Sequence, residues 1–308
     1  MYTKQSSDKI QELKSPALSI KTGYLDDDFR IFSLVSEEEG EFQPHYHSFH
    51  KLLFFESGNV SYYVEGETYE LQPFDLVLVP AGEVHRPVIH SGLPYRRLIL
   101  YLSPAFFEAY KKESVDLFHC FSLCSARASH VLRFSDLSES RLYTPLQELS
   151  QCARRPSDPS DLLYQKSVLV QFLLLLNQWT EEGSPAFPAA SISSPQILQV
   201  ISYINQHLSD ELSIDQIASA CFLHRSYLMH LFRQETGTTI GGYLTEKRLF
   251  SARTLIQSGY PVTEAALQSG FPSYSAFYRA YLKKYGCSPK DCRRQSKRIF
   301  ATRFSTCP

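Results

Sequence analysis

The chain has 308 residues, more than the roughly 100–200 residues of one typical domain, and this length predicts two domains with separate cores. Hydrophobic residues make up 43% and charged residues 20% of the chain, which is typical of folded proteins and excludes disorder as a description of the whole. The longest apolar run, from Val168 to Leu176, is too short to cross a bilayer, and no apolar stretch follows Lys4 as it would in a secretory signal. We therefore expect a cytoplasmic protein.

Charge is distributed unevenly along the chain. The formal net charge is -1, from 31 lysines and arginines and 32 acidic residues. From residue 195 onward there are 14 lysines and arginines and 7 acids, which leaves 17 and 25 before that point, so the two parts carry about +7 and -8. A positive excess predicts that the second part binds a polyanion such as DNA, and that the acidic first part does not.

The first third of the chain is typical of β-structure. Between about Leu18 and Leu102, short apolar runs such as Val60 to Val64 are separated by turn residues, which predicts a β-rich barrel or sandwich. After Pro104 the spacing of the apolar residues becomes that of a helix. Further helices are expected from Arg141 to Cys152 and from Leu162 to Trp179. The last of these is apolar around much of its circumference, which indicates that it lies between the barrel and a second subunit.

A segment rich in proline and small residues, from Glu181 to Ser191, is typical of a linker between domains. Everything after Ser194 has a helical pattern, which begins with this capping serine and Pro195. We therefore place a β-rich domain at residues 1–180, a linker at 181–194 and a helical domain at 195–308.

The helical domain contains a pattern typical of a helix-turn-helix unit. Ser213 caps a short helix, and after a brief turn a second helix runs from about His224 to Gly237, where glycine suits the left-handed residue after a helix end. Spacings of three and four residues put one set of side chains on the outward face of the second helix. This set comprises Arg225, Ser226, Met229, His230 and Arg233. Such an arrangement enters the major groove of DNA.

The same pattern recurs later in the chain. The positions from Val262 to Phe271 repeat those from Ile214 to Leu223 at a spacing of 48 residues. The outward face of the second copy comprises Tyr274, Ser275, Tyr278 and Arg279, with Lys283 beside it. A long helix from Thr239 to Ile256, which carries Arg248, can hold the two recognition helices in a fixed relation. One copy would also fit an ordinary helical bundle, but two copies in a basic domain predict DNA binding.

Four short motifs in the helical domain are typical of one family. They are Phe232 to Gly237, Arg248 with Ala252, Ser269 to Phe271, and Gly286 to Pro289. Over about Gln196 to Arg294 the chain resembles the DNA-binding domain of the AraC family of transcription regulators. The resemblance implies RNA polymerase as a partner, and it implies that these side chains face the bases: Ser226, Met229 and His230 in the first unit, and Tyr274, Ser275, Tyr278 and Arg279 in the second.

Two positions depart from the family pattern. Phe222 stands where the first turn usually has glycine, and His230 stands where the first recognition helix often has arginine. We therefore expect guanine to be read chiefly by Arg279, whose guanidinium can donate to two acceptors of that base. Further DNA contacts are expected from Arg225, Arg233, Arg248 and Lys283.

Two histidine-containing motifs lie in the β-rich part. Pro44 to His47, then Gly58, and Pro80 to His85 resemble the cupin motifs of AraC-type sensor domains over about Phe42 to Leu102. The resemblance implies a jelly-roll barrel around a pocket for a small-molecule effector, and a sugar is the class that the family suggests.

In metal-dependent cupins, the positions of His45, His47 and His85 bind a metal together with a glutamate, and this chain has Lys51 at the glutamate position. Because a cation repels a divalent ion beside it, we expect no bound metal and no cofactor. We expect His45, His47, His85 and Tyr62 to contact the effector instead.

These features predict a two-domain α+β protein, with a cupin-like β-barrel and trailing helices followed by an all-α domain of two helix-turn-helix units. The predicted function is that of a homodimeric, DNA-binding transcription regulator that is not an enzyme. Two alternatives stay open: a metal-binding cupin enzyme with an accessory helical domain, and a regulator whose barrel serves only for dimerisation. The paired units and Lys51 favour the effector-responsive regulator.

Overall fold

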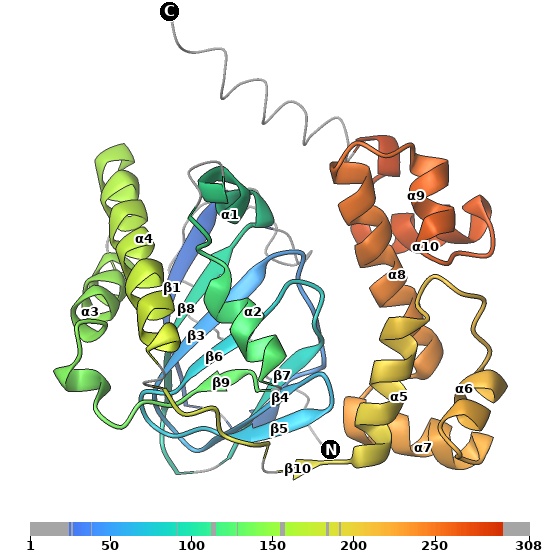
Figure 1. The fold of residues 1–308 in the computed structure, drawn as a ribbon, viewed down its shortest axis with the longest axis horizontal. Coiled ribbons are helices and arrows are strands. Elements are labelled where there is room, and N and C mark those ends of the chain that lie inside the picture. The colour runs from blue at the N-terminus through green and yellow to red at the C-terminus, as the bar shows by residue number, and fades with distance from the viewer. Residues whose placement is uncertain are drawn as a thin grey trace, which may run out of the picture.

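The computed structural model describes residues 25, 27–37, 39–90, 92–111, 115–127, 129–154, 158–182, 185–190 and 192–291. An antiparallel β-domain with its own helices lies beside a second, helical domain, which confirms the predicted two-domain α+β fold (Figure 1). None of the described helices is long and apolar enough to span a membrane. Lys4, Leu18 and Ser191 lie outside the described ranges, and so do five of the 14 basic residues counted from residue 195 onward, namely Arg293, Arg294, Lys297, Arg298 and Arg303.

The β-domain is built from two antiparallel sheets. One sheet has the order β1 (Phe29–Ser36), β8 (Tyr95–Leu102), β3 (His50–Ser57), β6 (Leu76–Val79) and β9 (Val131–Leu132). The other has the order β10 (Ile192–Ser193), β5 (Glu67–Glu70), β4 (Val60–Val64), β7 (His85–Ile89) and β2 (Gly40–Glu41). Apart from the β4–β5 hairpin, neighbours in these sheets are not consecutive in sequence, as in a jelly roll.

Alternation along the strands separates the inside of the barrel from its outer face. On β3, Leu53 and Phe55 pack between the two sheets, together with Tyr62 of β4. Leu52 and Phe54 point the other way and pack against helices. Burying an apolar side chain of this size contributes about 1.5–3 kcal/mol, so both faces of this sheet stabilise the domain.

The trailing helices cover the outer face of the first sheet (Figure 1). They are α1 (Pro104–Lys111), α2 (His119–Ala126), α3 (Tyr143–Cys152) and α4 (Pro159–Glu181), with a short 3-10 turn at Leu137–Glu139. Helix α4 is capped by Asp158, whose side chain accepts hydrogen bonds from the backbone N–H groups of Ser160 and Asp161. The sequence pattern predicted α1, α3 and α4, and it did not predict α2.

The described residues of the segment predicted as a linker are hydrogen-bonded to the β-domain. Strand β10 pairs with β5, and Ala186 exchanges backbone hydrogen bonds with Arg133 at 2.8 and 2.9 Å. The Ser129 hydroxyl donates to the backbone oxygen of Pro188 at 2.9 Å. A composition rich in proline and alanine therefore does not prevent this segment from joining the β-domain through its backbone.

The helical domain contains the predicted repeat. Its helices are α5 (Pro195–Gln206), α6 (Ile214–Ala220), α7 (Arg225–Thr236), α8 (Ile240–Gln257), α9 (Val262–Gln268) and α10 (Tyr274–Tyr285). Helices α6 and α9 both have 7 residues, and the recognition helices α7 and α10 both have 12. Gly237 and Gly286 end the recognition helices with φ of 72° and 67°, a left-handed conformation that glycine adopts without strain.

Phe222 breaks the symmetry between the two units. It has φ of 56° and is 92% exposed, whereas Gly270 occupies the equivalent turn with φ of 84°. The left-handed conformation costs a non-glycine residue roughly 1–2 kcal/mol, and an exposed ring gains little packing in return. Glycine loses more chain entropy on folding, which offsets part of the relieved strain. We therefore expect Phe222→Gly to raise the free energy of unfolding, measured by urea denaturation, by about 0.5–1 kcal/mol.

The matched control for this change is Phe222→Ala, which removes the ring and keeps the strained Cβ. It should give no gain in stability. A glycine variant that is less stable than the original chain would show that the exposed ring makes a stabilising contact.

Candidate functional site

The predicted DNA-reading residues lie on exposed faces of the two recognition helices. On α7 the exposed set is Arg225, Ser226, Met229, His230 and Arg233, and on α10 it is Tyr274, Ser275, Tyr278, Arg279 and Lys283. The opposite faces are buried in the cores of their units through Leu228 and Phe232 on α7, and Phe277 and Tyr281 on α10. Each unit therefore presents polar side chains outward on a helix that its own core holds in place.

Two of the arginines have partners within the protein. Arg225 forms an ion pair with Asp215, which joins the two helices of the first unit. Arg248 donates from Nε to the backbone oxygen of Leu208 at 3.0 Å and from Nη2 to that of Asp210 at 2.7 Å. The guanidinium of Arg248 is thus committed to holding the loop after α5 against α8.

A polar cluster lies inside the barrel. Lys51 is 5% exposed and Tyr62 is 0% exposed, and the Lys51 ammonium lies 5.5 Å from the centre of the Tyr62 ring. Arg97 stacks over the Tyr95 ring at 4.1 Å. The sequence left the register of β4 open, and the structure puts Tyr62 inside the barrel and Tyr63 against the helical domain.

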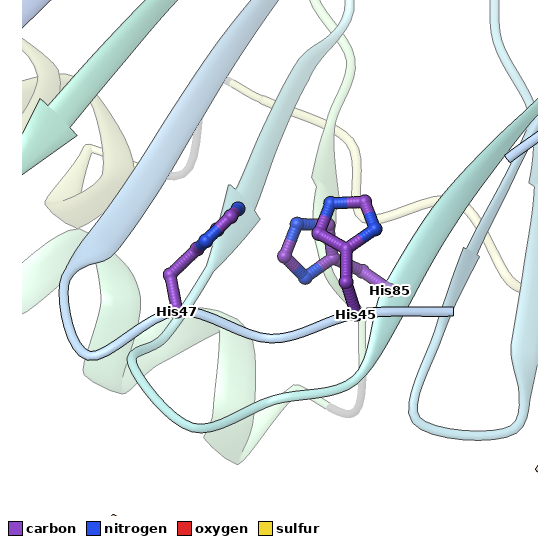
Figure 2. A group of neighbouring side chains, drawn as sticks. All are labelled: His45, His47 and His85. Carbon is purple, nitrogen blue, oxygen red and sulfur yellow. The ribbon is translucent and has the colours of Figure 1, made fainter. Parts of the chain in front are cut away.

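Three histidines meet beside this cluster. His45 and His85 face each other across an antiparallel bridge, with backbone hydrogen bonds of 3.2 and 2.9 Å, and His47 lies two residues further along. The ring centroids are 4.5 Å apart for His45 and His85, 5.0 Å for His45 and His47, and 5.1 Å for His47 and His85. Each ring offers one nitrogen within 4.8 Å of the other two (Figure 2).

The hydrogen bonds of these rings decide what they can bind. Nδ1 of His45 lies 2.9 Å from the backbone oxygen of Gln43, and Nδ1 of His85 lies 3.0 Å from that of Glu83. A carbonyl oxygen only accepts, so both Nδ1 atoms donate and both Nε2 atoms present a lone pair. Nε2 of His85 and both ring nitrogens of His47 are buried without a hydrogen-bond partner among the described residues.

Burial, and then the charge of Lys51, lower the pKa of all three imidazoles. They are therefore neutral near pH 7, as metal ligands must be. Burial followed by the charge of Arg97 also lowers the pKa of Lys51 to about 7, so that much of this amine is neutral there as well. This weakens the repulsion on which the expectation of no metal was based.

The three rings fit a transition-metal ion. Neutral imidazoles with Nδ1–H fixed on a carbonyl oxygen are the usual arrangement of histidine ligands, and His45 and His85 have it, whereas His47 has no such partner among the described residues. The chain's own ligands to such an ion would be His45, His47 and His85. A bound ion would supply a Lewis-acidic position able to take an oxygen atom of a small molecule.

The tip of the β4–β5 hairpin joins the two domains. The Glu65 carboxylate accepts hydrogen bonds from the Tyr243 hydroxyl at 2.5 Å and the Val84 backbone N–H at 2.6 Å, and it forms an ion pair of 2.8 Å with Lys247. A Cβ added to the neighbouring Gly66 would lie 3.0 Å from Ile201, so the hairpin packs closely on α5. This contact could not be predicted from the sequence, because Glu65 and Gly66 have the pattern of an ordinary turn.

A second contact between the domains comes from the histidine segment itself. Tyr46, between His45 and His47, packs against Phe250 of α8 at 6.4 Å between ring centroids. The Lys284 ammonium of α10 lies 4.6 Å from the Tyr46 ring centre. Pro44 packs against Gly237, where an added Cβ would lie 2.6 Å from the proline ring.

Both parts of the chain match known family models. A model described as "AraC-like ligand binding domain" matches residues 35–173. A model described as "Helix-turn-helix domain" matches residues 206–295. The first match covers most of the described barrel and its helices, and the second covers both recognition helices.

Several characterised regulators are similar to the chain. The xylose operon regulatory protein of Escherichia coli is 32% identical over 104 residues, which span 33% of this chain and 26% of that protein, so this chain spans about a quarter of that relative. The RCS-specific HTH-type transcriptional activator RclR of Escherichia coli is 24% identical over 76% of this chain and 80% of its own length. The solved C-terminal domain of AraT, a response regulator from Geobacillus stearothermophilus, is 30% identical over 33% of this chain and 85% of that domain, with a TM-score of 0.32.

Proposed function

Because the chain belongs to the AraC family of transcription regulators, we propose that it is a sequence-specific DNA-binding regulator that responds to a small-molecule effector. The observation that carries the proposal is the repeated, exposed polar face of α7 and α10 in a basic domain. Two such helices suit two successive major grooves of DNA. A cytoplasmic location follows from this role, and the proposal assigns no catalytic residue.

The exposed side chains divide into base-reading and phosphate-binding groups in this proposal. We assign base contacts to Ser226, Met229 and His230 on α7, and to Tyr274, Ser275, Tyr278 and Arg279 on α10. We assign phosphate contacts to Arg225, Arg233 and Lys283. Arg248 supports the interface from within, because its guanidinium is occupied by backbone oxygens of the loop after α5.

The proposed effector site is the part of the barrel interior that His45, His47, His85 and Tyr62 line. The Nε2 lone pairs of His45 and His85 accept hydrogen bonds or bind a cation, and the buried Tyr62 hydroxyl lacks a partner among the described residues. A sugar supplies several hydroxyl donors at short spacing, which suits this cluster. The xylose operon regulatory protein among the relatives supports a sugar as the effector class.

Homodimerisation is assigned to the outer face of α4. Helix α4 leaves four large apolar residues exposed, namely Leu162, Leu163, Tyr164 and Leu174, of which Leu163 and Leu174 lie on the same face because they are 11 residues apart. A second copy of the chain would bury them, as expected for a helix that is apolar around much of its circumference. Contact with RNA polymerase is proposed from family membership alone.

An effector screen on DNA binding tests this function. The full chain is incubated with duplexes selected from a random pool, and its affinity is measured with and without each of a panel of monosaccharides. We expect one sugar to change the affinity about fivefold or more, the lower end of typical allosteric coupling. A chain that selects no duplex would contradict the regulator, and selected binding that no sugar changes would contradict a sugar effector.

A further inference from the structure

Lys51 is a buried amine on the inner face of β3. It alternates in phase with Leu53 and Phe55, so its side chain points between the two sheets, where it is 5% exposed. Its neighbour across to β8 is Tyr101, and its amine lies 5.5 Å from the centre of the Tyr62 ring. The barrel interior therefore holds a lysine nitrogen among aromatic side chains.

The charges around Lys51 do not balance it. Among the described residues no carboxylate forms an ion pair with this amine, and the charged group that acts on it is a second cation, Arg97. A buried ammonium without an anion is costly, and loss of a proton removes that cost. Burial, and then Arg97, lower the pKa of Lys51 to about 7. About half of the amine is therefore neutral at pH 7, against roughly one part in a few thousand for an ordinary exposed lysine.

A neutral lysine amine attacks carbonyl carbons. Lysines that form Schiff bases with carbonyl compounds are activated by desolvation or by a neighbouring cation. Lys51 meets both conditions, because it is buried and Arg97 acts on it. The barrel therefore contains a nucleophile toward aldehydes.

Buried polar atoms near Lys51 suit the rest of a small hydroxyaldehyde. The hydroxyl of Tyr62 and both ring nitrogens of His47 have no hydrogen-bond partner among the described residues, and the same holds for Nε2 of His85. The rings of Tyr62 and His85 stack with centroids 6.2 Å apart. A molecule with one carbonyl group and several hydroxyl groups would react with the amine and satisfy these atoms.

We propose that Lys51 captures an aldehyde effector, such as the open-chain form of a reducing sugar, as a reversible imine inside the barrel. This inference rests on the proposed function, and it narrows the effector from a sugar to a molecule that presents an aldehyde. The nitrogen lone pair attacks the carbonyl carbon, and the new C–N bond gives a carbinolamine. The oxygen then leaves as water with the two hydrogens of the amine, and a C=N bond remains. No oxidant or reductant is needed, and addition of water reverses the step.

Reductive trapping on the full chain tests this proposal. The chain is exposed briefly to glyceraldehyde and cyanoborohydride, which reduces an imine to a stable secondary amine. Peptide mass analysis then compares modification of Lys51 with that of Lys283, an exposed lysine on α10. At pH 7 we expect Lys51 to react at least about tenfold faster, which is less than the ratio of neutral amine because burial slows access.

The pH dependence and unfolding supply two controls. From pH 8 to pH 7 an ordinary exposed lysine loses its neutral form about tenfold, whereas an amine with a pKa of about 7 loses it about twofold. The ratio of Lys51 to Lys283 modification should therefore rise about fivefold over this interval. In concentrated urea the ratio should fall to about one, because the barrel no longer desolvates the amine.

A matched pair of small molecules tests the link to DNA. Glyceraldehyde, without reductant, should change the affinity of the full chain for its selected duplex about fivefold or more, the lower range of allosteric coupling. Glycerol, which has hydroxyl groups and no carbonyl, should not change it. Lys51→Met should bind the duplex and lose the response to glyceraldehyde.

Equal modification of Lys51 and Lys283 in the folded chain, or a ratio that urea leaves unchanged, would overturn the nucleophile. Selective modification of Lys51 with an affinity that glyceraldehyde does not change, or that glycerol changes equally, would overturn its part in sensing. Either result leaves the proposed function intact as long as the chain selects duplex DNA. A chain that binds no DNA would refute the function itself, whatever Lys51 does.

Discussion

Raising the salt concentration from about 50 to about 200 mM should weaken binding of the full chain to random duplex DNA about 100-fold. Each phosphate contact releases condensed counterions, and the logarithm of affinity falls by about 0.9 per contact for each tenfold rise in salt. On random DNA no guanine is matched to Arg279, so its guanidinium can contact a phosphate together with the three proposed phosphate contacts, Arg225, Arg233 and Lys283. Four contacts give a fall of this size over a fourfold change in salt. Fluorescence anisotropy at a series of salt concentrations measures it.

Two controls assign this binding to the basic domain. Residues 194–308 alone should bind random DNA with the same steep dependence, and residues 1–185 should not bind. Lys283→Ala should weaken binding to all sequences and lower the salt slope by about one. Equal affinity of the two fragments, or an affinity that salt leaves unchanged, would contradict the division of roles.

Arg279→Ala should lower affinity for the preferred DNA site about 5- to 150-fold, the equivalent of roughly 1–3 kcal/mol, and relax the preference at one base pair. Arg279 is exposed on α10 next to Tyr278 and four residues after Ser275, on the face that the proposal turns toward the bases. A guanidinium there can donate to both O6 and N7 of a guanine. Competition assays with single-base variants of the site measure both effects.

Arg279→Lys distinguishes base reading from simple attraction, because lysine keeps the charge and loses the planar fork. It should recover affinity for random DNA while the preference at that base pair stays relaxed. An Arg279→Ala variant that loses affinity equally for preferred and random DNA would show that Arg279 contacts phosphate and does not read sequence.

The helical domain could be predicted in detail because its signals are local. Capping residues such as Ser213, apolar spacing of three and four, and Gly237 after the helix end are all properties of neighbouring residues. The same holds for the repeat of α6 and α7 as α9 and α10, which shows as a fixed spacing in sequence. The exposure of the expected recognition residues follows from this periodicity, and their contact with DNA stays a prediction.

The contacts between domains could not be predicted, because they join residues far apart in sequence. Glu65 and Lys247 both have the pattern of ordinary surface charges, yet they form a largely buried ion pair. Arg248 was expected on DNA from its charge, and only the fold shows the backbone oxygens of Leu208 and Asp210 within its reach.

The members of the histidine cluster could be predicted from the sequence, but the charge around them could not. The resemblance to the cupin motifs identified His45, His47 and His85 as a group, and the structure brings their rings together. The inference against a metal used the charge that Lys51 carries in water. Its burial inside the barrel lowers the pKa of that amine, and sequence spacing contains no measure of burial.

Whether the two helix-turn-helix units read DNA together is tested by selecting binding sites for the full chain from random duplexes. Two recognition helices held in a fixed relation by α8 should reach successive major grooves. We expect two clusters of preferred bases about 10 bp apart, with the guanine preference of one cluster lost in Arg279→Ala. A single cluster that Arg279→Ala leaves unchanged would contradict joint reading by the two units.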